Sequence, residues 1–112
     1  MLLDTAVIDE LRETLGDDVW RSFADRMLAE VADTARTLDT LLSQGDLDTL
    51  ARTAHRTSGS AAGTGAKGLH ALLKEIENTA RSGDATRLPA LLATIPLRAE
   101  ETRAAMSAHS GP

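Results

Sequence analysis

The chain has 112 residues, which is long enough for one domain with a buried core and too short for two. Its formal charge of −5 and its lack of a basic cluster argue against nucleic acid or an anionic membrane surface as a partner, and the absence of cysteine excludes disulfides and thiolate chemistry. Aromatic residues make up only 2% of the chain, so the core must be built from aliphatic side chains and methionine, which favours packed helices over a strand-rich fold.

The start of the chain and its hydropathy pattern predict a cytoplasmic protein. The opening residues, MLLDT, contain no basic segment and no long apolar stretch, so no signal peptide is expected. No run approaches the ~20 apolar residues that a membrane-spanning helix needs, so no membrane insertion is expected. The lack of cysteine is consistent with a reducing compartment.

Glycine-containing turns divide the chain into five segments. The dipeptides Gly16-Asp17, Gly45-Asp46 and Gly83-Asp84 each place a residue that tolerates left-handed backbone geometry beside a favourable N-cap residue. This pattern predicts that one helix ends there and the next begins. The sequence Gly63-Thr64-Gly65 predicts a fourth break.

Apolar residues recur at helical spacing between these breaks. The expected helices cover about residues 5–15, 18–43, 47–64, 66–82 and 85–107, with a frayed tail over 107–112. In the second helix the apolar residues include Trp20, Phe23 and Met27, which follow one another at intervals of three and four residues. Pro89 lies where the last helix could begin, whereas Pro96 should kink or interrupt it.

The pattern as a whole predicts an all-α fold. Short connections favour an antiparallel up-down four-helix bundle, with the short N-terminal helix as a cap. No internal repeat or linker indicates a second domain, so residues 1–112 are expected to form a single domain. A bundle of this kind needs no second copy to complete its core, and a monomer is therefore expected.

The third helix contains a histidine among unusually small residues, in the tract 54–61, AHRTSGSA. An interior helix glycine costs about 1 kcal/mol relative to alanine, so something other than stability should favour Gly59. At 100° per residue, His55 falls at the margin of the apolar face. Its neighbours around the helix are all small: Ala51, Ser58, Gly59 and Ala62. A second protein could therefore bring its backbone close to this imidazole.

This tract, together with Gly65-Ala66 and a leucine-rich segment ending at Gly83-Asp84, resembles the histidine-containing phosphotransfer (HPt) domain of bacterial phosphorelays. The family pattern reads Ala-His-x-Leu-Lys-Gly-Ser-Ala, then Gly-Ala, then a leucine-rich helix and a Gly-Asp turn. The likeness covers nearly the whole chain and is most specific around His55. It implies a helical bundle that accepts a phosphoryl group from a receiver-domain aspartate, or from a kinase relay, and passes it to another receiver. Such a protein is a stoichiometric carrier and not a turnover enzyme.

The resemblance also implies roles and partners. His55 would be the phosphoacceptor, and Glu77 on the next helix would orient its ring, with ordinary solvation as the alternative for Glu77. The partner would be a response-regulator receiver domain, a hybrid sensor histidine kinase, or both. The residues expected to dock it are Gly59, Ala62, Ala51 and Arg56. No cofactor is expected in the chain, because the partner receiver would supply Mg²⁺.

Other sites are not indicated. A metal site pairing His55 with His70 lacks a third ligand at a sensible spacing, and both His70 and His109 are interpreted as incidental. The stretch Gly63-Thr64-Gly65 lacks the spacing and the following Lys-Ser/Thr of a phosphate-binding loop, so no ATP site is expected.

Two positions depart from the family pattern. Ser58 stands where the family has lysine, and it replaces a charged donor to the phosphoryl oxygens with one neutral hydrogen bond. Lys67, Lys74 or Arg56 could compensate, but both lysines point away from the apolar stripe and are interpreted as solvated charges. Thr57 stands in place of leucine, with a hydroxyl that could bond back to the carbonyl of Thr53.

Two other functional interpretations remain open at this stage. The chain could be a binding module that docks a receiver or a kinase without carrying phosphate, and the missing lysine is the best support for this view. It could also be an unrelated structural bundle, which would explain the periodicity but not the histidine-glycine tract. For Gly59 itself, the alternative to a docking role is close packing against a neighbouring helix.

Overall fold

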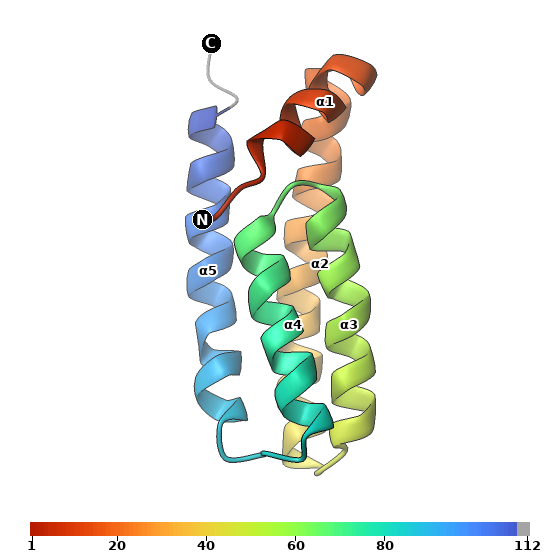
Figure 1. Ribbon diagram of the computed structural model, residues 1–112, viewed down its shortest axis with the longest axis vertical. Helices are drawn as coiled ribbons and strands as arrows, with labels where there is room; N and C mark the ends of the chain where they lie inside the picture. The colour runs from red at the N-terminus through yellow and green to blue at the C-terminus, as the bar shows by residue number, and fades with distance from the viewer. Residues whose placement is uncertain (110–112) are drawn as a thin grey trace.

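The computed structural model describes residues 1–109, and in that range the chain forms five helices and no strand (Figure 1). They are α1 (Thr5–Leu15), α2 (Asp17–Ser43), α3 (Leu47–Gly63), α4 (Lys67–Arg81) and α5 (Leu88–His109). The first four agree with the predicted ranges to within one residue at each end. The all-α prediction is confirmed.

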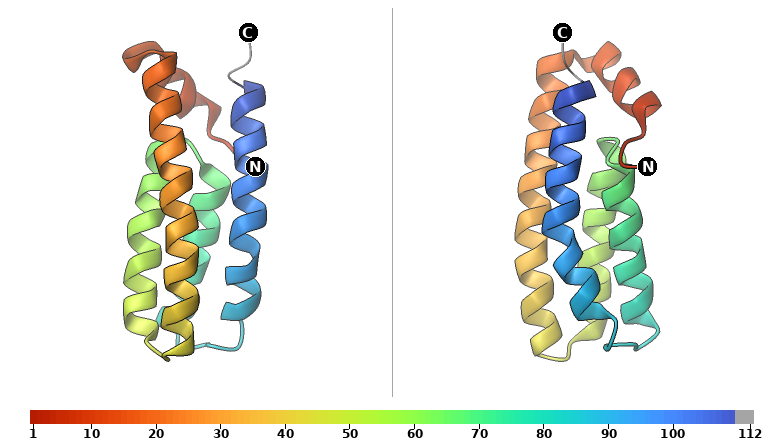
Figure 2. Two further views of the ribbon diagram at one scale, coloured as in Figure 1. Left: turned by 180° about the vertical axis from the view of Figure 1, so that it is seen from behind. Right: turned by 90° about the vertical axis from the view of Figure 1, so that its left-hand side faces the viewer.

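Helices α2 to α5 run alternately up and down along the long axis, which confirms the predicted up-down bundle (Figures 1 and 2). The molecule measures 45 × 20 × 20 Å. Helix α3 packs against α4 and α2, and α5 packs against α2 and α4. Both views in Figure 2 show that α2 and α5 extend beyond one end of the α3–α4 pair, where α1 lies across the bundle. The buried apolar side chains of all five helices form one core.

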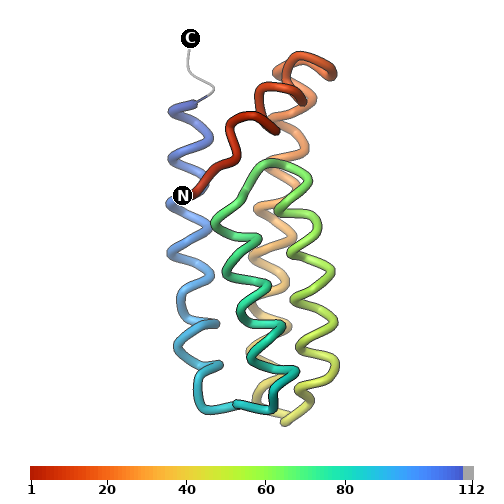
Figure 3. The backbone as a smooth tube through the Cα atoms, in the orientation of Figure 1, coloured from red at the N-terminus to blue at the C-terminus, as the bar shows by residue number. Residues whose placement is uncertain are grey.

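The N-terminal segment is tied to the α3–α4 connection, beside which it passes in the backbone trace (Figure 3). The amide of Asp4 donates to the carbonyl of Gly65 at 2.9 Å, and the amide of Gly68 donates to the carbonyl of Leu2 at 2.9 Å. Gly65 has φ +87°, and a Cβ there would lie 2.5 Å from Cγ1 of the buried Ile8. This turn therefore requires glycine both for its backbone conformation and for the close approach of α1.

The last helix differs from its predicted range at both ends. It begins at Leu88 and not at 85, so Pro89 lies in the first turn, where a missing amide proton costs no intrahelical hydrogen bond. It continues through Pro96, so of the two predicted effects of that residue, a kink or an interruption, the interruption is wrong. It also continues to His109, so the predicted fraying is wrong for residues 107–109, while 110–112 lie outside the described residues. His109 Nε2 lies 2.8 Å from Asp9 Oδ1 on α1, which holds this end of α5.

One residue in the apolar stripe of α2 lies at the surface. Trp20 and Met27 are buried, but Phe23 is exposed, and the Arg26 guanidinium lies 5.5 Å from the centre of its ring. The α3 residues beside this ring include Ser60 and Gly63, which are too small to cover it. The apolar stripe of α2 therefore includes one aromatic residue that the core does not.

No helix among residues 1–109 combines the length and the apolar character that a membrane crossing needs.

Candidate functional site

His55 lies in the middle of α3, where that helix meets α4. The helix begins at the N-cap Asp46, whose side chain accepts a hydrogen bond from the Thr49 amide at 3.1 Å. Its inward face buries Leu50, Ala54 and Ala61. This anchoring leaves His55 at the rim with 62% of its side chain exposed. The predicted accessible imidazole is present in the structure.

Glu77 of α4 reaches this ring from below the surface. Its Oε1 lies 3.1 Å from His55 Nδ1, although only 6% of the Glu77 side chain is exposed. The alternative that Glu77 is an ordinary solvated charge is therefore wrong. Two cations from its own helix hold the carboxylate as well: Lys74 Nζ lies 2.8 Å from Oε1, and Arg81 Nε lies 3.0 Å from Oε2.

The surroundings of Glu77 fix its ionisation state. Burial by itself would raise its pKa, but hydrogen bonds from Lys74, His55 and Arg81 outweigh the burial and lower that pKa from 4.5 to about 2. An ionised carboxylate can only accept hydrogen bonds. In a neutral imidazole, Nδ1 must therefore carry the proton that it donates to Glu77, and the lone pair must be on Nε2.

Ser58 does not occupy the place expected for a phosphoryl-contacting group. Only 2% of the residue is exposed, and its hydroxyl donates to the His55 backbone carbonyl at 2.7 Å. Its own carbonyl lies 2.9 Å from Nδ1 of His70, which donates to it from α4. The hydroxyl is buried and bonded within α3, so the expected contact between Ser58 and the phosphoryl oxygens is wrong. His70, interpreted as incidental, in fact links the two helices beside the site.

The four residues expected to dock a partner are not all at the surface. Gly59, Ala62 and Arg56 are exposed, and a Cβ added at Gly59 would meet nothing within 4 Å. The alternative that Gly59 packs against a neighbouring helix is therefore wrong. Ala51 is only 1% exposed because it belongs to the core, so the prediction that it contributes to docking is also wrong.

Thr57 makes a different contact from the one expected. Its hydroxyl lies 2.7 Å from that of Thr34 on α2, and both residues are buried. The predicted bond back to the Thr53 carbonyl is replaced by this link between helices, which satisfies two buried hydroxyls at once.

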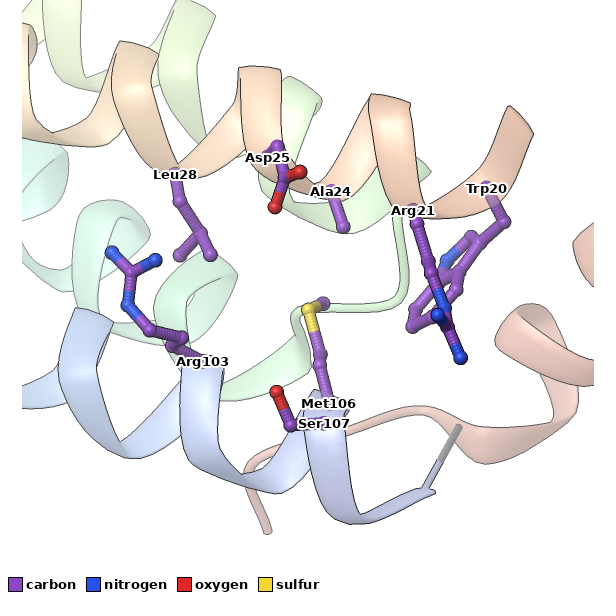
Figure 4. A pocket seen from close by; sticks show the side chains of 8 residues that line it. All are labelled: Trp20, Arg21, Ala24, Asp25, Leu28, Arg103, Met106 and Ser107. Atoms are coloured by element: carbon purple, nitrogen blue, oxygen red, sulfur yellow. The ribbon is translucent and has the colours of Figure 1, made fainter. Parts of the chain in front are cut away.

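Hollows also lie away from His55 on the described part of the bundle. A cavity of about 300 Å³ separates the first half of α2 from the last turns of α5 (Figure 4). Its lining includes Trp20, Asp25 and Met106 but neither His55 nor Glu77. Another hollow, of about 290 Å³, lies between Phe23 on α2 and Gly63 at the end of α3, the helix that carries His55. Within residues 1–109 no cluster of three potential metal ligands is found.

Sequence reasoning missed the two cations that complete the site. Lys74 was interpreted as a solvated charge, and Arg81 was given no role. Their spacing carries a signal, because they stand three residues before and four residues after Glu77, and such residues are neighbours on a helix surface. The signal becomes specific only once Glu77 is known to be buried.

Comparison with known proteins identifies the class of protein to which this fold and site belong. The family model "Hpt domain" matches residues 22–105, so the chain belongs to the Hpt domain family. Membership of this family supports a role as a histidine phosphotransfer carrier in phosphorelays, and the interpretation as an unrelated structural bundle is wrong.

A particular solved structure is similar over nearly the full length. It is the crystal structure of histidine-containing phosphotransfer protein B (HptB) from Pseudomonas aeruginosa PAO1. The TM-score is 0.85 at 29% sequence identity, covering 96% of this chain and 93% of that chain. No curated protein matches the sequence.

Proposed function

We propose that His55 accepts a phosphoryl group on Nε2 from a receiver-domain aspartate, or from a kinase relay, and passes it to another receiver. One observation carries this proposal: in the neutral imidazole, the hydrogen bond between His55 Nδ1 and the ionised, buried Glu77 leaves the lone pair on Nε2 of an exposed ring. The protein would act stoichiometrically in the cytoplasm, and the Mg²⁺ ion would belong to the receiver.

Phosphoryl transfer from the aspartate to His55 requires no proton to leave the site. The lone pair of Nε2 attacks the phosphorus of an aspartyl phosphate, the N–P bond forms, and the bond between phosphorus and the aspartate oxygen breaks, which returns a carboxylate to the donor. Since Nδ1 keeps its proton, the phosphorylated ring carries a positive charge beside the carboxylate of Glu77. Transfer to the next receiver reverses these steps.

Glu77 is a positioning residue in this scheme. Its hydrogen bond holds the ring in one orientation and one tautomer, and its negative charge stabilises the cationic ring that forms on attack. Lys74 and Arg81 in turn hold the carboxylate in place. A nucleophile that is oriented in this way before the partner arrives needs less ordering during transfer.

The surface around His55 suits an approaching receiver. Gly59 leaves open space one turn after the histidine, and Ala62, three residues further along α3, is small and exposed. Arg56 adds an exposed positive charge beside it, which would complement the acidic pocket that a receiver presents. We assign docking to Arg56, Gly59 and Ala62.

The test is direct chemical labelling. Wild-type protein incubated with phosphoramidate, or with a phosphorylated receiver, should gain an acid-labile, alkali-stable phosphoryl group. His55→Gln should abolish the label, whereas His70→Gln, which removes a half-buried histidine of α4, should retain it. Retention of the label by His55→Gln, or a wild type that is never labelled by either donor, would contradict the proposal.

The alternative binding module predicts a different result. Ser58 supplies no charge at the family's lysine position, and this favours docking without phosphate. In that case the unlabelled protein should bind a receiver tightly, and neither wild type nor any variant should take up phosphate. Labelling of His55 excludes this alternative.

A further inference from the structure

The phosphorylated site has an electrostatic problem. A phosphoryl group carries roughly −1.5 to −2 charges near pH 7, and close carboxylates repel it. Here the ionised Glu77 lies 3.1 Å from the ring that would carry it. Ser58 cannot offset the repulsion, since it is uncharged and its hydroxyl is bound to the His55 carbonyl. The phosphoryl group therefore needs a cation from somewhere else in the structure.

The cations near His55 differ in what they contact. Arg56, the next residue of α3, is exposed and is assigned above to docking, and Arg52, one turn before His55, is paired with Asp48 at 3.0 Å. Arg81 binds Oε2 of Glu77, the oxygen that His55 does not use. Lys74 binds Oε1, the same oxygen atom that accepts from His55 Nδ1. Of these cations, only Lys74 binds the carboxylate oxygen that also accepts from the imidazole.

We infer that Lys74, reaching across from α4, is the residue that binds the phosphoryl oxygens of phosphorylated His55. This inference rests on the proposed function of His55. The Lys74 side chain is 36% exposed, and its Nζ lies 2.8 Å from the Glu77 oxygen that also accepts from the ring, so we expect the ammonium group to reach a phosphoryl group on Nε2. An ammonium group has three donors, so it can contact a phosphoryl oxygen and still keep Glu77.

The division of labour between the two cations follows from their chemistry. The Lys74 ammonium is a compact charge on a flexible stem, which suits a group that is present in only one state of the carrier. Arg81 can remain on Oε2 throughout, so the carboxylate keeps a second cationic partner while Lys74 also contacts the phosphoryl group. The charge missing at Ser58 is thus replaced from a different helix and not from a neighbouring turn of α3.

The experiment compares Lys74→Gln with Lys67→Gln. Both variants remove one positive charge from α4, but in the described chain Lys67 is not among the donors that reach Glu77. Wild type and variants are labelled with phosphoramidate, which needs no docking surface. Phosphorus NMR then follows the rate of labelling, the rate of loss and the pH titration of the phosphoryl group.

We expect Lys74→Gln to slow labelling about 3- to 10-fold and to raise the pKa of the bound phosphoryl group by about half a unit or more, because a cation that favours its dianionic form is lost. Lys67→Gln should match wild type, and Lys74→Arg should restore most of the effect. A purely structural role for Lys74 would not move the phosphoryl titration.

The outcomes separate the two claims. If wild type is labelled at His55 and Lys74→Gln behaves like Lys67→Gln in both rate and titration, the inference about Lys74 is overturned while the carrier function stands. If wild type is never labelled at His55, by phosphoramidate or by a phosphorylated receiver, the proposed function fails and the inference fails with it.

Discussion

At the scale of single residues, the site depends on placing one carboxylate under the surface with every oxygen occupied. A buried carboxylate is costly unless it is paired and hydrogen-bonded. Glu77 meets this condition through donors from two helices, His55 on α3 and Lys74 and Arg81 on α4. The same contacts that offset the cost of burial also keep the charge in place, and that charge sets the tautomer of the histidine.

The pKa of Glu77 predicts how stability changes in acid. In the unfolded chain the carboxyl has its ordinary pKa of 4.5, and in the fold the pKa is about 2, so between these values the unfolded state binds more protons. The stability that ionised Glu77 contributes is complete above about pH 4.5 and is lost as the pH falls toward 2. Wild type should therefore exceed Glu77→Gln in free energy of unfolding by roughly 2–3 kcal/mol at pH 6, and the gap should close toward pH 2.

Urea unfolding at several pH values measures this gap. Glu75→Gln is the control, since it removes an exposed carboxylate from the same helix and should stay close to wild type throughout. A gap between wild type and Glu77→Gln that is constant from pH 6 to pH 2 would show that the charge of Glu77 contributes nothing to folding.

At the scale of the helices, a pair of buried hydroxyls joins two of the helices behind the site. The pair Thr34 and Thr57 joins α2 to α3 inside the core, directly behind the face that presents His55. Leucine, the family's usual residue at 57, would offer only apolar contact, whereas this pair adds a directional bond. The bond ties α3 to α2 two residues after His55.

Pro96 lies in the interior of α5 and gives a prediction about that helix. It has no amide proton, so the carbonyl of Leu92 lacks its usual helical donor. Because Pro96 is exposed, Pro96→Ala should restore that bond without disturbing the core and should raise the free energy of unfolding by about 1–2 kcal/mol, less than the full ~3 kcal/mol helix penalty.

Chemical denaturation checks this value against Pro89→Ala. Pro89 stands in the first turn of the same helix, where the missing amide proton has no intrahelical partner in any case, so that substitution should change stability by about 0.5 kcal/mol at most. Equal effects of the two substitutions would show that the restored hydrogen bond is not the cause.

At the scale of the whole molecule, the N-terminal segment and α1 close one end of the bundle through the turn at Gly65. Alanine at this position would require a strained backbone at φ +87° and would push its Cβ to 2.5 Å from Ile8. Gly65→Ala should therefore lower the free energy of unfolding by about 2–4 kcal/mol, the combined cost of strain and overpacking.

The matched control is Gly59→Ala, in which a Cβ on the exposed face of α3 meets nothing within 4 Å. This substitution should raise stability by about 0.5–1 kcal/mol, because alanine is the better helix former. Thermal unfolding of the two variants should thus give shifts of opposite sign. Loss of stability in Gly59→Ala would show that this glycine is needed for the fold itself.

The sequence was sufficient to predict the helices, their order and the location of the histidine. Helical periodicity and glycine turns are local signals, so α1 to α4 were predicted to within one residue at each end. The position of His55 at the edge of its own helix's apolar face is likewise a property of that helix alone. The pairing of His55 with Glu77 was expected from family resemblance, but its geometry was not.

Only the tertiary structure decided which of these faces are covered. Phe23 belongs to an apolar stripe, yet it is exposed because small residues face it from α3, whereas Ala51 is buried by its neighbours. Lys74 points away from its helix's apolar stripe, yet it reaches the carboxylate that binds the histidine. A periodic pattern gives the direction of a side chain relative to its own helix axis, but its surroundings depend on the rotation and the side-chain sizes of the neighbouring helix.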